Sequence, residues 1–191
     1  TFYARFDTKF DRLFFESEVV EAGKKIVLAN VGKVFKKSQG AVIFDGEPYG
    51  LHKRVFITAA GNVTYEGKDM SLAYEQYRAF PFDLNLHVVG SDQTGYFKVM
   101  IKALETLNAK FKGKEFHLPM GMVRLVGKKM SSRTGVILKV DDLLAEVKRL
   151  IRPLIHTEGL SKPEIEQIAE VLTITAIKYS ILRVGPTMGV V

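Results

Sequence analysis

The residues best suited to chemistry lie in one short run, which reads KKMSSRTG from position 128 to position 135. Its cations can offset the charge that develops on a departing phosphate group, and its hydroxyls and backbone amides can donate hydrogen bonds to phosphate oxygens. The side chains with this capacity are Lys128, Lys129, Ser131, Ser132 and Arg133. The run predicts a loop that folds over a triphosphate, and the alternative is a solvated basic turn between two strands.

A second polar run, Gly90-Ser91-Asp92-Gln93, follows the apolar segment 84–89 directly and precedes a predicted helix. Glycine lets a ligand approach the backbone closely, and Asp92 can accept hydrogen bonds from ribose hydroxyls. The Gln93 amide can both donate and accept hydrogen bonds toward an amino-acid ligand. The run predicts a nucleoside and amino-acid site after a strand, and the alternative is that Asp92 only caps the helix.

A mixed α/β chain must position these runs, because the hydrophobic periodicity alternates between about 2 and about 3.6 residues. Helices are predicted at 17–35, 69–80, 96–107, 141–155 and 161–183, and strands at 41–44, 54–57, 63–65, 84–89, 115–118 and 136–140. Ser161 and Glu164 form a capping-box pattern at the start of the last helix. The strand, crossover helix and strand between 84 and 118 imply parallel strands, and ligands bind such sheets beyond the carboxyl ends of the strands.

The composition is that of an ordinary globular protein of 191 residues, with 47% hydrophobic and 26% charged residues. The chain has no cysteine, which excludes disulfides and thiolate metal sites and fits a cytoplasmic protein. The four histidines are scattered, so no metal site is expected, and no run of about twenty apolar residues predicts a membrane span. The net charge of +7 favours a polyanion such as a nucleic acid as a partner.

Taken in order, these runs resemble the motifs of class I aminoacyl-tRNA synthetases, and of arginyl-tRNA synthetase in particular. KKMSSRTG is similar to the KMSKS signature in the MSxR form common in arginyl enzymes, with Ser132 at the position of the second consensus lysine. GSDQ is similar to the family's GxDQ element, and shorter matches to its FD, ES, GA, GMV and KY elements extend over almost the whole chain. The resemblance implies an α/β, Rossmann-like (HUP-type) nucleotide-binding fold with a parallel sheet, followed by an α-helical segment. Residues 1–155 would be the carboxyl-terminal half of the catalytic domain, and residues 156–191 the start of a helical anticodon- or tRNA-binding domain.

Tyr65 stands four residues before Asp69, a spacing typical of the YxxxDxA pattern of arginyl-tRNA synthetases, in which the pair holds the guanidinium of the substrate. A carboxylate accepts from the fixed fork of guanidinium donors in a bidentate manner. Ser71 stands where that pattern has alanine. The alternative is that Asp69, at the start of a predicted helix, is only a helix cap.

The resemblance implies ATP-dependent activation of L-arginine to arginyl-adenylate and transfer of the arginyl group to tRNA(Arg), with Mg²⁺ bound through the ATP phosphates. The residues implied to bind arginine are Tyr65, Asp69 and Gln93. Those implied to bind ATP are Gly90, Asp92, Met122, Val123 and Lys128. Those implied to be catalytic at the phosphates are Lys129, Ser131, Ser132 and Arg133.

The family's other signature, HIGH or HxGN, follows none of the four histidines. We therefore expect that the chain begins downstream of that signature in a longer protein, and that the isolated chain does not form aminoacyl-adenylate at a meaningful rate. Two alternatives stay open: another class I synthetase, of the tyrosyl or tryptophanyl type, and a non-catalytic tRNA-binding module.

Overall fold

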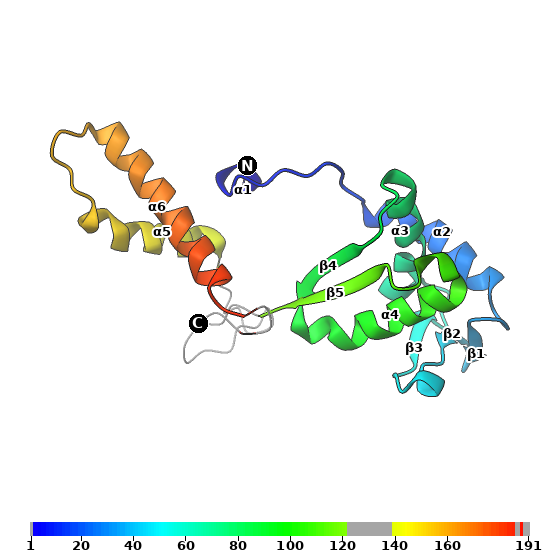
Figure 1. The fold of residues 1–191 in the computed structure, drawn as a ribbon. Coiled ribbons are helices and arrows are strands. Elements are labelled where there is room, and N and C mark those ends of the chain that lie inside the picture. The colour runs from blue at the N-terminus through cyan, green and yellow to red at the C-terminus, as the bar shows by residue number, and fades with distance from the viewer. Residues whose placement is uncertain (1, 122–138, 186–187, 189–191) are drawn as a thin grey trace. The chain divides into compact units, whose positions relative to one another are not determined.

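The computed structural model describes residues 2–121, 139–185 and 188. The chain divides into two compact units (Figure 1). We call residues 11–119 the sheet unit, and residues 1–10 together with 120–191 the helical unit. Helices and strands alternate in the sheet unit, so the predicted α/β class is confirmed.

The sheet unit contains a three-stranded antiparallel sheet in the order β1-β2-β3. Its strands are β1 (Lys36–Ser38), β2 (Ala41–Phe44) and β3 (Arg54–Ile57). The predictions of β2 and β3 are confirmed, and Phe44 pairs with Arg54 at the start of β3. The strand predicted at 63–65 is reduced to one bridge between Ile57 and Val63.

Helix α2 (Glu16–Ala29) is shorter than the helix predicted at 17–35, so that prediction was wrong at its carboxyl end. The chain turns at Asn30, whose side-chain amide donates to a carbonyl oxygen one turn earlier at 2.8 Å. It then passes through Gly32 at a φ of +89°, which favours glycine. Phe35 thereby leaves the helical path and is fully buried in the aromatic core of the unit.

Helix α3 (Tyr65–Ala79) begins four residues before the predicted start at 69. Thr64 is its N-cap and accepts a hydrogen bond from the amide of Gly67. The Thr64 hydroxyl also donates to the carbonyl of Val55 at 2.7 Å, which ties the helix start to β3. Asp69 therefore lies inside the helix, and the interpretation of Asp69 as a helix cap is wrong.

The predicted parallel arrangement is confirmed by a second sheet, made of strands β4 and β5 (Figure 1). The elements of this part of the chain are β4 (Asn85–Gly90), a 3₁₀ turn (Ser91–Gln93), α4 (Thr94–Leu107), a second 3₁₀ turn (Ala109–Phe111) and β5 (Glu115–Met120). The amide of Asn85 donates to the carbonyl of Lys114 at 2.7 Å, which sets the two strand starts side by side. No side-chain cap bond forms at the start of the 3₁₀ turn or of α4, so the alternative in which Asp92 only caps the helix is wrong.

Two glycines let α2 and α3 approach at backbone distance. A Cβ atom added at Gly23 on α2 would lie 2.3 Å from the carbonyl oxygen of Gly67 on α3. A Cβ atom added at Gly67 would lie 2.6 Å from the carbonyl oxygen of Phe56 on β3. The two glycines therefore allow the first turn of α3 to pack between α2 and the sheet. The start of α3 carries Tyr65, Glu66 and Asp69 of the candidate site.

Replacing Gly23 by alanine should destabilise the sheet unit by about 1–3 kcal/mol, because the added methyl group overpacks a contact with backbone that cannot rotate away. Urea unfolding followed by circular dichroism measures this loss. Gly95→Ala is the matched control, because a Cβ atom at Gly95 on α4 meets nothing within 4 Å. Equal stability of the two variants would contradict the prediction.

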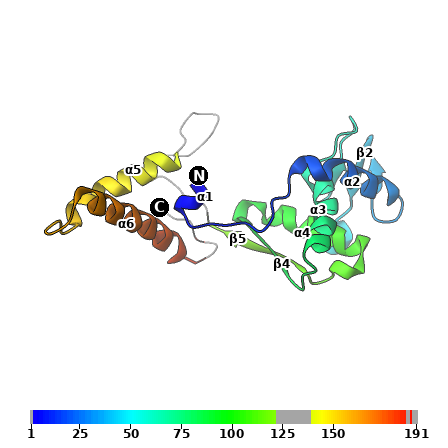
Figure 2. The same cartoon turned by 90° about the horizontal axis from the view of Figure 1, so that it is seen from above.

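The helical unit is built around a pair of packed helices (Figure 2). Its elements are α1 (Phe2–Arg5), α5 (Val140–Ile151), a 3₁₀ turn (Arg152–Leu154) and α6 (Lys162–Leu182). The predicted capping box is confirmed, because the amide of Ser161 donates to the Glu164 carboxylate at 2.8 Å. Lys148 on α5 pairs with Glu166 and Glu170 on α6 at 2.6 Å and 2.7 Å.

The strand predicted at 136–140 falls mostly outside the described residues, and its last residue, Val140, begins α5 instead. The boundary predicted near residue 156 stays a prediction. Among the residues that the structure describes, no helix is long and apolar enough to cross a membrane.

Candidate active site

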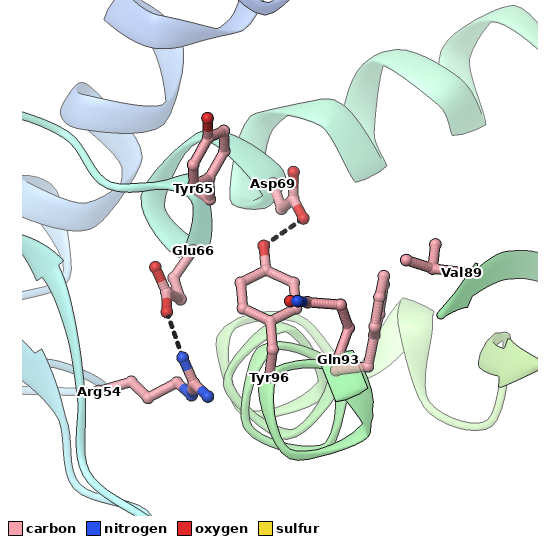
Figure 3. A pocket seen from close by; sticks show the side chains of 8 residues that line it. Arg54, Tyr65, Glu66, Asp69, Val89, Gln93 and Tyr96 are labelled. Carbon is pink, nitrogen blue, oxygen red and sulfur yellow. Dashed lines mark hydrogen bonds and ion pairs between the residues drawn. The ribbon is translucent and has the colours of Figure 1, made fainter. Parts of the chain in front are cut away.

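A cleft of about 430 Å³ opens in the sheet unit between the start of β3, the first turns of α3, the end of β4 and the start of α4. Its walls combine charged, phenolic and aromatic side chains (Figure 3). The lining residues are Arg54, Tyr65, Glu66, Asp69, Val89, Gln93, Tyr96 and Phe97.

The structure brings together the three residues predicted to bind arginine, because Tyr65, Asp69 and Gln93 all line this cleft. Tyr65 is 68% exposed at its rim, with the Lys68 ammonium 4.9 Å from the ring centroid. Gln93 comes from the turn after β4 and lies in front of Tyr96 in the view of Figure 3.

The structure describes only some of the residues predicted to bind ATP. Gly90 ends β4, and Asp92 is exposed in the following turn, where its carboxylate accepts from the Gln93 amide at 3.2 Å. Neither lines the cleft itself. The other predicted residues lie outside the described part of the chain, namely Met122, Val123, Lys128, Lys129, Ser131, Ser132 and Arg133.

Asp69 is the carboxylate at the centre of the cleft. The Tyr96 hydroxyl donates to its Oδ2 atom at 2.5 Å (Figure 3). Burial raises the pKa of Asp69 above its ordinary value, and the hydrogen bond from Tyr96 opposes this rise. Burial also raises the pKa of Tyr96, with the Asp69 charge acting in the same direction, so Tyr96 stays the proton donor of the pair.

A partly buried ion pair forms the wall next to this centre. Arg54 Nη1 on β3 donates to Glu66 Oε1 on α3 at 2.9 Å, and Glu66 is only 9% exposed. The Arg54 guanidinium also lies 5.5 Å from the ring centroid of Tyr96. The cleft therefore places two carboxylates and one guanidinium around one phenol, which leaves the ionised cluster with a net negative charge.

The two parallel strands support the back of the cleft through a buried carboxylate. Glu115 on β5 accepts from the side-chain amide of Asn85 at 3.0 Å and lies 2.7 Å from Nε2 of His87, both on β4. Phe97, which lines the cleft, stacks on His117 with ring centroids 4.4 Å apart. This network joins β4 to β5, and the Gln93 turn follows β4 directly.

Comparison with known proteins identifies the chain. Residues 3–186 match the family model described as tRNA synthetases class I (R), catalytic domain. The chain belongs to this family. The arginine-tRNA ligase of Treponema denticola is 32% identical to this synthetase chain over 188 residues, which cover 96% of this chain and 32% of that protein. The arginine-tRNA ligase of Bacteroides fragilis is 31% identical and is covered to the same extent, 32%.

Solved structures show that the synthetase chain shares its fold with arginyl-tRNA synthetases. The Plasmodium falciparum enzyme matches with a TM-score of 0.77 at 18% identity, covering 98% of this chain and 32% of that one. The Thermus thermophilus enzyme matches with a TM-score of 0.74 at 20% identity, covering 98% of this chain and 38% of that one. The chain spans about a third of the length of the curated relatives it matches.

Sequence reasoning missed several residues that line the cleft of this class I synthetase domain. Glu66 stands three residues before Asp69, and Tyr96 three residues after Gln93, so helical spacing was a signal for both. Arg54 gave no local signal, because its partner Glu66 lies twelve residues along the chain on another element. Within the described residues, no group of three or more histidine or acidic side chains is arranged to hold a metal ion.

Proposed function

We propose that the protein containing this chain is an arginine-tRNA ligase and that the cleft is its arginine pocket. The observation that supports this most directly is the convergence of Tyr65, Asp69 and Gln93 on a cleft with a net negative charge. A guanidinium offers several donors in a fixed plane, and a partly buried carboxylate held by Tyr96 is a matching acceptor. The names of the relatives agree with this substrate.

The proposed reaction has two steps. The arginine carboxylate attacks the α-phosphorus of ATP, so arginyl-adenylate forms and pyrophosphate leaves. A ribose hydroxyl of tRNA(Arg) then attacks the acyl carbon, which forms the ester and releases AMP. In this proposal Asp69 and Tyr65 hold the guanidinium and Gln93 holds the amino-acid end.

The nucleotide is proposed to lie at Gly90 and Asp92, beyond the carboxyl end of β4. Met122 and Val123 are proposed to contact its base, and Mg²⁺ is proposed to arrive bound to the ATP phosphates. The run KKMSSRTG is proposed to neutralise the phosphates through Lys128, Lys129, Ser131, Ser132 and Arg133. We further propose that the anticodon- or tRNA-binding domain begins near residue 156 and that the protein works in the cytoplasm.

Arginine-dependent exchange between ATP and pyrophosphate in the full-length enzyme tests this function. Exchange with arginine but not with tyrosine or tryptophan is the expected result. Exchange that depends on tyrosine or tryptophan would instead assign another class I specificity. Salt-sensitive tRNA binding with no exchange for any amino acid would assign a non-catalytic tRNA-binding module.

Replacing Tyr96 by phenylalanine should make arginine binding more sensitive to acid. Burial raises the pKa of Asp69, and the Tyr96 hydrogen bond that opposes this rise would be lost, so the pKa should rise further. Because a guanidinium needs the ionised carboxylate, the KM for arginine rises as pH falls, and in the variant this rise should begin at a higher pH. At neutral pH the KM should increase about tenfold, as expected for one lost hydrogen bond to a charged group.

Measuring the KM for arginine from about pH 5 to about pH 9, roughly two pH units on either side of neutrality, checks this prediction. Tyr74→Phe is the matched control, because the Tyr74 hydroxyl contacts Asn108 at 3.2 Å outside the cleft. A pH profile of the Tyr96 variant identical to that of the control would refute the prediction.

A further inference from the structure

The Arg54–Glu66 pair raises a question about charge, because it places a guanidinium of the protein in the wall of a pocket proposed to bind a guanidinium. Arg54 is one-third exposed, and its Nε atom is buried without a hydrogen-bond partner. Glu66 is nearly buried and lies three residues from Asp69 on the same helix. With Arg54 absent, Glu66 would lose its cation partner, and an unpaired carboxylate would stand three residues from Asp69 on the same helix.

We propose that Arg54 is a positioning residue of the arginine pocket, which neutralises Glu66 so that Asp69 is the carboxylate presented to the substrate guanidinium. This inference rests on the proposed function of the cleft. It adds that the pocket is tuned to accept a single positive charge.

The position of Arg54 supports a charge-balancing role. Arg54 begins β3 and is paired with Phe44 of β2, so its backbone belongs to the sheet rather than to a loop. Its guanidinium reaches Glu66 on one side and lies 5.5 Å from the Tyr96 ring on the other. Since Tyr96 donates to Asp69, the arginine is coupled to the central carboxylate through one intervening side chain.

The groups that shift the pKa of Asp69 lie on helices α3 and α4 and on strands β4 and β5. Burial raises the pKa of Asp69; Tyr96 on α4 and His87 on β4 oppose that rise, while Glu66 on α3 and Glu115 on β5 add to it. Removing Arg54 leaves the charge of Glu66 unpaired and should raise the pKa of Asp69 further. Removing the charge of Glu66 should lower it, and should also leave the Arg54 cation to repel the substrate.

The test measures the KM and kcat for arginine against pH in the full-length enzyme carrying R54M, E66Q or both substitutions. For R54M we expect the acid rise in KM to move to higher pH, with KM at neutral pH increased about tenfold or more. For E66Q we expect the acid rise to move to lower pH, together with a higher KM plateau. The double variant R54M/E66Q should return both the KM and the pH of its rise toward the wild-type values, because it carries neither charge.

The control is K53M, at the residue next to Arg54. This substitution removes an exposed ion pair between Lys53 and Glu47 at 3.0 Å and should leave the dependence of KM on pH unchanged. If R54M does not fold, the opposite shift of E66Q and the behaviour of the double variant still decide the question. A role in packing alone would raise KM in all three variants without moving the pH of the rise, and that result would overturn the proposal. A wild-type enzyme without arginine-dependent exchange would overturn the proposed function as well, whereas an active wild type with unshifted variants would overturn this inference only.

Discussion

Replacing Asp69 by asparagine is expected to raise the KM for arginine by about 100-fold or more, because the substrate loses a charge-assisted, bidentate acceptor. Asparagine keeps the shape of the side chain and one acceptor oxygen, but it replaces the other oxygen and the negative charge with an amide donor, which a guanidinium cannot accept from. The same variant should gain stability. Burial raises the pKa of Asp69, so ionisation of this group in the folded state opposes folding at any pH above its ordinary, unfolded-state value.

The sign of the stability effect follows from proton linkage. Between the unfolded and folded pKa values of Asp69 the folded state binds more protons, so the stability contributed by this group falls as pH rises through that window. The variant should therefore melt at a higher temperature than the wild type at neutral pH, and the difference should disappear at pH values below the unfolded-state pKa.

Arginine kinetics and thermal melting on the same samples check both effects of Asp69→Asn. Asp83→Asn is the matched control, because the Asp83 carboxylate is fully exposed and, among the residues that the structure describes, pairs only with Lys114 at 3.3 Å. An Asp69 variant that melts below the wild type while retaining a normal KM would contradict both parts of the prediction.

Replacing Glu115 by alanine is expected to destabilise the sheet unit by about 3 kcal/mol or more, because buried donors lose their shared acceptor. The Glu115 side chain is fully buried between Asn85 and His87. Removing it leaves the Asn85 amide with Gln76 as its remaining partner and opens a cavity between the two parallel strands.

Urea unfolding of wild type and variants measures this loss of free energy. Glu115→Gln is the informative companion, because it keeps the volume and one acceptor oxygen and should lose distinctly less stability than alanine. Equal losses for glutamine and alanine would show that the negative charge, rather than the shape and the acceptor, holds β4 and β5 together.

The parallel part of the fold was predictable because its signals are local. An apolar run that ends at Gly90, followed by helical spacing from Phe97 to Leu107, places strand and helix within a few residues of their observed bounds. The helix predicted at 17–35 failed for a tertiary reason. Helical apolar spacing continues through Val31, Val34 and Phe35, but these residues lie beyond the end of α2 and pack in or against the hydrophobic core of the sheet unit.

The site was predictable only in part. Tyr65, Asp69 and Gln93 stood out by spacing and by resemblance, and the fold brings all three to one cleft. Arg54 could not be found in the same way, because it meets Glu66 through a contact between elements that are distant along the chain. Helical spacing from Gln93 pointed to Tyr96, but its hydrogen bond to Asp69 joins two different helices and so could not be predicted. Whether a charged side chain faces a substrate or another side chain is a property of the packing, which local sequence does not contain.

The helical unit is assembled from both ends of the chain, and this has a consequence for the order of events during synthesis. Arg5 reaches Glu170 at 2.8 Å, and Lys178 donates to the carbonyl of Phe6 at 2.6 Å. On a ribosome, residues 11–119 can acquire their native contacts as soon as they emerge, because the unit is contiguous. Residues 5 and 6 must wait for α6 before these partners exist, so the helical unit can be completed only after the sheet unit has been synthesised.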